Sequence, residues 1–379
     1  MITSARASAL AGLAALAVAV GIGRFAFTPI LPMMQEDFGL SVSQGGWLAS
    51  ANYLGYLAGA VSAIGLRLRP VIAIRIGLLA IGVSTLAMGL EHEFMIWVVL
   101  RTVAGIASAW VLVFVSTWAL ERLAFLGRSN LGGTVYAGVG AGIVIAGGVC
   151  LVVMGLHASS TEAWLWLGVL SIAITAAIWP LMTTNPSVEP VRVPAGASGI
   201  WNAEYRRLVL CYGAFGFGYI IPATFLPAMA KAIVQDSQLF GWAWPVFGVA
   251  AVVSTVLAAQ LERFLSHRTV WIAGHLVMAL GVAIPLFVGG LPGIMVAALL
   301  VGGTFMVVTM AGLQEARRVA GAQARALMAA MTSGFALGQI LGPAIVSLLF
   351  QSTGGLAPAL ILAASTLILS AVSLKRDAK

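Results

Sequence analysis

Charged residues are scarce in this sequence. Only 8% of its 379 residues are Asp, Glu, Lys or Arg, while 61% are apolar. Soluble domains carry about 25% charged residues, and a water-soluble fold of this length could not bury so much apolar surface. The composition therefore excludes a soluble cytoplasmic enzyme and predicts a polytopic protein that contacts the lipid bilayer.

The sequence also lacks the motifs of common enzyme chemistries. None of its few lysines closes a G-x-x-x-x-G-K phosphate loop, and neither a G-x-S-x-G elbow nor an H-E-x-x-H helix occurs. Its 4 histidines are scattered, and its 2 cysteines, Cys150 and Cys211, fall near opposite membrane faces in the predicted topology. We therefore expect no enzymatic activity, no metal site, no cofactor and no disulfide.

Long apolar runs fill the rest of the chain. A helix needs about 20 mainly apolar residues to cross the bilayer, and runs without polar–apolar alternation predict helices rather than barrel strands. The fold class is therefore an all-α membrane protein with twelve transmembrane helices, predicted at 7–33, 44–65, 71–90, 94–119, 130–155, 162–182, 205–230, 239–260, 269–289, 291–313, 324–350 and 355–374.

The net charge of +8 is explained by where the basic residues lie. With the N-terminus inside, nearly all of the 20 Lys and Arg residues fall at predicted cytoplasmic ends of spans, which is the positive-inside pattern. The basic charge thus indicates topology, with both termini cytoplasmic, and we expect no nucleic-acid partner.

The chain is predicted to consist of two related halves. A polar loop at 183–203 separates an N-terminal six-helix bundle (1–182) from a C-terminal one (204–379). Gly21 and Gly23 recur 195 residues later as Gly216 and Gly218, and a second pair recurs at almost the same offset, Gly138 and Gly142 as Gly334 and Gly338. Because each half has six spans, both halves begin on the same side of the membrane and have the same orientation. The pattern therefore predicts two bundles related by a pseudo-two-fold axis along the membrane normal.

This plan resembles the major facilitator superfamily over the whole chain. The segments 21–34 and 47–59 are similar to its YbfB/YjiJ-like bacterial branch. The resemblance implies a multi-pass transporter of the bacterial cytoplasmic (inner) membrane that works by alternating access.

The superfamily's motif positions are only partly retained. The loop after Gly59 carries Arg67 and Arg69 but lacks the Asp of the usual gating motif. Three further motifs are matched: Arg101 with Gly105 in span four, Gly138-x-Gly-x-Gly142 in span five without its proline, and Gly338-x-x-x-Gly342-Pro343 in span eleven. The resemblance implies that these residues form the gating and conserved-motif positions of the family.

Two arginines lie inside predicted spans. Arg24 belongs to span one and Arg101 to span four, and no predicted span interior contains a carboxylate to pair with them. Charges within the membrane are costly and indicate function by default, and a guanidinium binds carboxylates bidentately. The functional interpretation is an anion-binding site; the alternative is that both arginines bond to helix-end carbonyls or waters and only shape the bundle.

Other polar side chains are candidates to line the same cavity. The superfamily resemblance puts their spans around the centre, and they are Asn52, Tyr56, Tyr136, Tyr219 and Gln339. Helix packing is the alternative for each aromatic residue.

The sequence therefore predicts a secondary active or facilitative transporter that moves a small organic solute, preferably an organic anion. The alternative in the same class is proton-coupled efflux of amphipathic compounds, which the glycine motif of span five suggests. A membrane sensor or an intramembrane enzyme is a third class, for which the sequence offers neither an output domain nor paired catalytic groups. We expect a monomer whose partners are the substrate and the bilayer.

Overall fold

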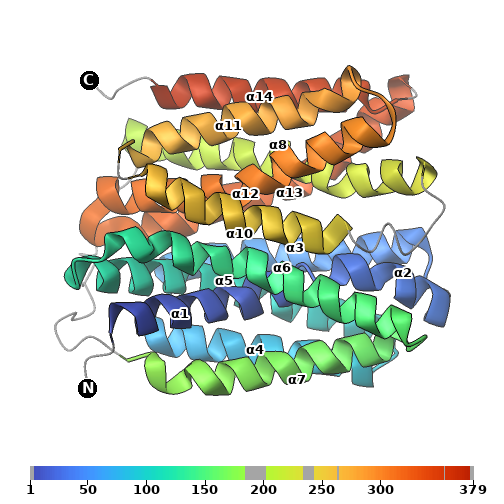
Figure 1. Ribbon diagram of the computed structural model, residues 1–379, viewed down its shortest axis with the longest axis horizontal. Coiled ribbons are helices and arrows are strands. Elements are labelled where there is room, and N and C mark those ends of the chain that lie inside the picture. The colour runs from blue at the N-terminus through green and yellow to red at the C-terminus, as the bar shows by residue number, and fades with distance from the viewer. Residues whose placement is uncertain (1–3, 184–201, 234–242, 263, 354, 376–379) are drawn as a thin grey trace.

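A computed structural model describes residues 4–183, 202–233, 243–262, 264–353 and 355–375. These residues form helices that run nearly parallel to one another, with no strand among them (Figure 1). The N- and C-terminal ends lie at the same end of the molecule, which we call the terminal side (Figure 1). The all-α fold class predicted from the sequence is confirmed.

The first six predicted spans all appear as helices. They are α1 (Ala5–Leu16), η1 (Ala17–Ile22) and α2 (Phe27–Phe38), which together form span one; α3 (Val42–Gly65); α4 (Pro70–Leu90); α5 (Phe94–Phe125), followed by the short turn η2 (Ser129–Leu131); α6 (Gly132–Gly155); and α7 (Ser160–Ile178) with η3 (Trp179–Leu181).

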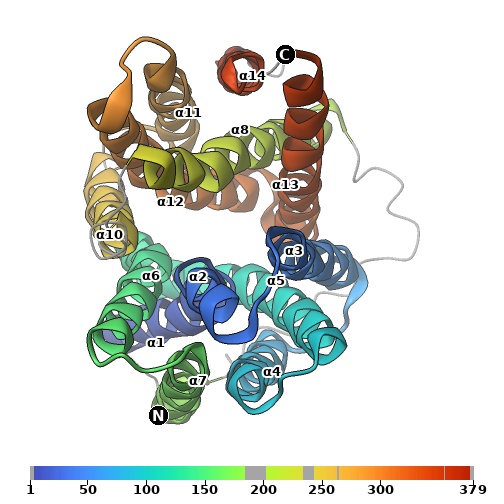
Figure 2. The same cartoon turned by 90° about the vertical axis from the view of Figure 1, so that its right-hand side faces the viewer.

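The last six spans also appear as helices. They are α8 (Ala203–Ile233), α10 (Ala243–Leu261), α11 (His267–Ala283) with η4 (Ile284–Leu286), α12 (Gly290–Ala320) with η5 (Gly321–Gln323), α13 (Ala324–Thr353) and α14 (Ala357–Lys375). Seen end-on, α1–α7 form one group and α8–α14 another (Figure 2). Most of the predicted 183–203 linker lies outside the described residues, so the division at that loop stays a prediction.

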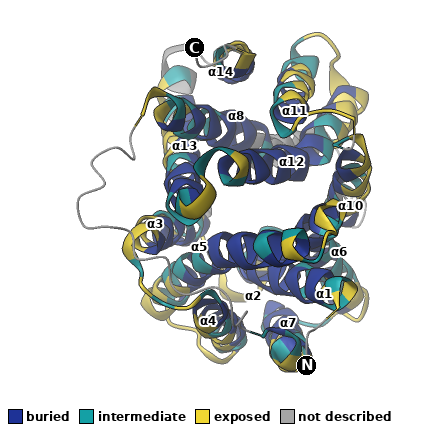
Figure 3. Ribbon diagram, turned by 90° about the vertical axis from the view of Figure 1, so that its left-hand side faces the viewer, coloured by how far each residue is buried: buried dark blue, intermediate teal, exposed yellow. Residues whose placement is uncertain are grey.

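Nine stretches of the described chain are long and apolar enough to cross a membrane, and one of them, Gly290–Val346, includes both α12 and much of α13. The helix α3 is not among the nine because Asn52, Tyr53 and Tyr56 lower its mean hydropathy. Large apolar side chains such as Trp166 and Val83 are more than half exposed. Buried residues face inward and exposed ones outward (Figure 3). Exposed apolar side chains are expected where lipid rather than water surrounds the helices.

The repeated glycines hold equivalent helix pairs together. A Cβ atom on Gly138 would overlap the carbonyl oxygen of Leu13, and one on Gly338 would overlap that of Gly213. The helix pair α1–α6 in the first half thus corresponds to α8–α13 in the second. Small residues let helix backbones approach closely, so these motif glycines serve packing in this structure.

The glycines of spans two and four also serve packing. A Cβ atom on Gly59 would overlap the carbonyl oxygen of Ile106, and one on Gly105 that of Asn52, so both glycines press α3 against α5. In span eleven, Pro343 lies inside α13.

Span one is broken near its middle, where the sequence predicted one continuous helix. The amides of Gly23 and Phe25 bond to carbonyls five residues earlier, and the regular helix resumes only at Phe27. A π-helical turn of this kind disturbs the regular hydrogen-bond ladder. The break lies at Arg24, so it positions the residue that the sequence marks as the first functional candidate.

Candidate functional site

Arg24 connects the two helix groups. Its guanidinium group donates a hydrogen bond to the side-chain oxygen of Gln339 on α13, and its Cζ atom lies 4.0 Å from the ring centroid of Tyr56 on α3. Arg24 is only 5% exposed, and its Nε atom has no partner among the described residues. Three of the sequence-predicted residues, Arg24, Tyr56 and Gln339, therefore meet at one point.

Aromatic rings surround this point from both halves. The Arg24 Cζ atom lies 5.6 Å from the rings of Phe25 and Tyr53 and 5.8 Å from that of Phe335. The predicted residue Tyr219 belongs to the same cluster, because its ring stacks on Phe305 at 4.6 Å and lies 6.2 Å from Phe335. The rings offer their electron-rich faces to the cation.

Arg101 instead supports the break in span one. Its Nη1 and Nη2 atoms donate to the carbonyl oxygens of Gly23 and Arg24 at 3.2 and 3.3 Å. Ser108, on the same helix, donates to the carbonyl of Ala19 at 2.7 Å. Asn52 donates in turn to the carbonyl of Arg101 at 3.0 Å. The bonds from Arg101 and Ser108 satisfy carbonyl groups of the irregular turn in span one. A direct role of Arg101 and Asn52 in binding stays a prediction.

The remaining sequence candidates lie apart from Arg24. Tyr136 on α6 is fully buried, and its hydroxyl has no partner among the described residues; no described contact connects it to Arg24. Arg67 and Arg69 are exposed between α3 and α4 and make no ion pair with the residues that the structure describes. The gating role of these two arginines likewise stays a prediction.

Sequence reasoning missed most of the apolar rings at the site. Phe25, Phe305 and Phe335 carry no polar atom, so nothing in a single sequence distinguishes them from the other phenylalanines. Two signals were available: Phe25 directly follows Arg24, and Tyr53 lies between the candidates Asn52 and Tyr56.

Comparison with known proteins agrees with this architecture. Residues 16–375 match the family described as uncharacterised MFS-type transporter YbfB. The chain belongs to this family. It is also similar to the uncharacterized MFS-type transporter YceJ of Bacillus subtilis (strain 168), with 27% identity over 289 residues that cover 71% of this chain and 70% of the relative. The protein is therefore a multi-pass membrane transporter of the major facilitator type, as the resemblance implied.

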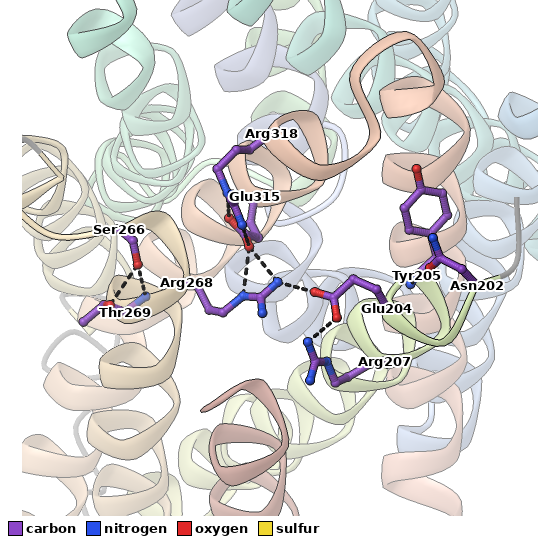
Figure 4. A network of polar contacts seen from close by, with 9 residues as sticks. All are labelled: Asn202, Glu204, Tyr205, Arg207, Ser266, Arg268, Thr269, Glu315 and Arg318. Atoms are coloured by element: carbon purple, nitrogen blue, oxygen red, sulfur yellow. Dashed lines mark hydrogen bonds and ion pairs between the residues drawn. The ribbon is translucent and has the colours of Figure 1, made fainter. Parts of the chain in front are cut away.

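This transporter carries a cluster of ion pairs between charged residues of its second half (Figure 4). The carboxylate of Glu315 on α12 is fully buried and accepts hydrogen bonds from Arg268 at 2.9 Å and from Arg318 at 2.7 Å. Arg268 also pairs with Glu204, which in turn pairs with Arg207. The cluster joins α8, α11 and α12 of the second half, so it braces one bundle rather than the boundary between the two.

A cavity of about 640 Å³ lies near this cluster, away from Arg24. Its polar lining comes from α5 and η2 of the first half and from α12, the residue after α10 and the start of α11 in the second; it includes Glu121, Asn130, Glu262, His267, Gln314 and Arg317. The cavity therefore lies where the two halves of the transporter meet. No group of His, Cys, Asp and Glu in the described part of the chain has the arrangement of a metal site.

Proposed function

We propose that this transporter moves a small organic anion across the cytoplasmic membrane by alternating access, with both chain termini in the cytoplasm. The substrate carboxylate binds at Arg24, between the two bundles. In transporters built from parallel repeats, the substrate site lies near the bilayer midplane at the boundary of the repeats, and the bundles rock around it.

One observation carries the proposal: Arg24 is a buried cation without a carboxylate partner among the described residues. Its described hydrogen bond goes to the neutral amide of Gln339, and none of the described ion pairs involves it. A buried charge is costly unless it is paired. An anionic substrate would supply the missing charge, and a guanidinium group can bind a carboxylate through two parallel hydrogen bonds.

Proton-coupled efflux of amphipathic compounds has less support. The glycine motif that suggested it packs α6 against α1 through Gly138 and against η1 through Gly142, so the motif is explained without proton coupling. A cationic drug would also meet the like charge of Arg24 in a site of low dielectric constant.

The test compares variants of Arg24 in the purified, full-length protein. Organic anions and cationic drugs are screened by thermal shift, since a ligand that binds the folded state raises its stability. Arg24→Gln should abolish binding of the anions that stabilise the wild type. Arg24→Lys should weaken their binding at least tenfold, because lysine keeps the charge but loses the planar fork.

Arg6→Gln is the matched control, since it removes the same charge at an exposed position of α1 and should leave binding unchanged. Normal anion binding and transport by Arg24→Gln would contradict the proposal.

A further inference from the structure

The site around Arg24 has unused hydrogen-bond donors at two places. The Nε atom of Arg24 and the side-chain nitrogen of Gln339 are buried without an acceptor among the described residues. The same holds for the indole nitrogen of Trp244 at the start of α10. Most buried polar groups in proteins are paired, and an unpaired one costs free energy. Since all three groups are donors, the molecule that satisfies them must carry acceptors.

The first two donors lie side by side. The side-chain oxygen of Gln339 already accepts from Arg24, so its NH₂ group remains available next to the guanidinium. Both side chains are at least nine-tenths buried. A carboxylate can accept several hydrogen bonds on its two oxygens, so one carboxylate can bond to both residues at once.

The third donor belongs to a wall of aromatic rings beside Arg24. The ring of Phe25 is 5.6 Å from the Arg24 Cζ atom and 6.2 Å from the ring of Trp244. Trp244 stacks on Phe247 with centroids 5.5 Å apart and an interplanar angle of 7°, and Phe25 also meets Phe305 edge-on at 5.6 Å. We call Phe25, Trp244, Phe247 and Phe305 the aromatic wall. The ring of Trp244 thus lies less than 12 Å from the guanidinium, which is within reach of one small aromatic molecule.

We infer that the substrate is an aromatic monocarboxylate with a neutral oxygen at the end opposite its carboxylate. The carboxylate bonds to Arg24 and Gln339, the ring packs on the aromatic wall, and the far oxygen accepts from the Trp244 indole. This inference rests on the proposed function, because Arg24 must first bind an anion. A second carboxylate at the far end would be left without a cation, since Trp244 donates one neutral hydrogen bond.

The chemistry is tested by calorimetric titration of the full-length protein with three carboxylates. The probes are 4-hydroxybenzoate, 4-methylbenzoate and cyclohexanecarboxylate. The first two match in size and differ in the far oxygen, and the third lacks the aromatic ring. We expect 4-hydroxybenzoate to bind roughly three- to tenfold tighter than 4-methylbenzoate, the range for one net hydrogen bond, and cyclohexanecarboxylate to bind more weakly than either.

The variant Trp244→Phe keeps an aromatic ring and removes the donor. It should weaken 4-hydroxybenzoate binding more than 4-methylbenzoate binding, so that the two probes bind the variant about equally. Trp166→Phe, at an exposed position of α7, is the control and should change neither. The comparison of probes on the wild type needs no variant, so it tests the inference even where Trp244→Phe unfolds.

The outcomes separate the inference from the function on which it rests. Equal binding of 4-hydroxybenzoate and 4-methylbenzoate, or an equal loss of both in Trp244→Phe, overturns the far-oxygen contact. Cyclohexanecarboxylate binding as tightly as 4-methylbenzoate overturns the role of the aromatic wall. In both cases the proposed function stands if Arg24→Gln abolishes binding. Binding of all three acids that survives Arg24→Gln, or no binding of any organic anion, overturns the proposed function as well.

Discussion

Replacing Gln339 by Glu would place a carboxylate where a neutral amide now accepts from Arg24. In the wild type, an incoming anion meets a neutral amide at Gln339, whose side-chain oxygen accepts from Arg24 and whose NH₂ group is available to donate. In Gln339→Glu it has to break an ion pair between two buried side chains, each no more than 5% exposed in the wild type. The substitution keeps the size of the side chain, so packing against α3 and α5 should be preserved.

The expected effect follows from the electrostatics of this pair. Two opposite unit charges about 4 Å apart attract by about 4 kcal/mol at an effective dielectric constant of about 20. Desolvation of the new carboxylate offsets part of this gain, which leaves about 2 kcal/mol. A substrate carboxylate that competes with this pair should bind roughly 30-fold more weakly, while the substrate-free protein should melt at a higher temperature.

The assay is calorimetric titration of an organic anion that binds the wild type, together with thermal unfolding of both proteins. Gln44→Glu is the matched control, because Gln44 closes a capping box at the start of α3 and Glu serves equally well in that motif. A raised melting temperature with unchanged anion affinity would refute the reasoning, since the ion pair would then form without competing with the substrate.

Three further outcomes are expected. Reporter fusions at Ser198 and at Lys379 should be active only as cytoplasmic reporters, and an extracytoplasmic signal at either would contradict the twelve-span topology. Gly138→Val should lower the melting temperature markedly because its Cβ atom would overlap the α1 backbone, whereas Gly148→Val, a position with no atom within 4 Å of a Cβ, should change it little. Asp37→Asn should leave proton-driven accumulation in proteoliposomes intact, since the Asp37 carboxylate accepts from the backbone N–H and hydroxyl of Ser160; loss of accumulation with retained exchange would identify this carboxylate as the proton carrier.

The helical class and the approximate position of each span could be read from the sequence because both depend on the summed hydropathy of neighbouring residues. About 20 consecutive residues decide whether a segment can cross the bilayer, and neighbours elsewhere in the chain hardly alter that result. The packing glycines were also recognisable, because a repeat at a constant offset is a property of the sequence itself. Gly138 and Gly338 accordingly perform the same function in the two halves.

The sequence marked Arg24, Tyr56 and Gln339 only as candidates to line one cavity. It did not predict that their side chains contact one another. The sequence marked both arginines as candidates, Arg24 first, and the fold separates them. Arg101 is drawn to the carbonyls of a helix break that no local pattern marked, while Arg24 faces the opposite bundle.

The contacts of Arg24 join residues more than 300 positions apart, such as Gln339, and the aromatic wall combines a ring of span one with rings of α10 and α12. A phenylalanine at a binding site and one in a packed core have the same side chain, and only the tertiary structure decides which rings face the buried charge. The sequence by itself therefore determined the membrane fold and its helices, and the assembly of the two bundles decided which arginine lies at their boundary without a carboxylate partner among the described residues.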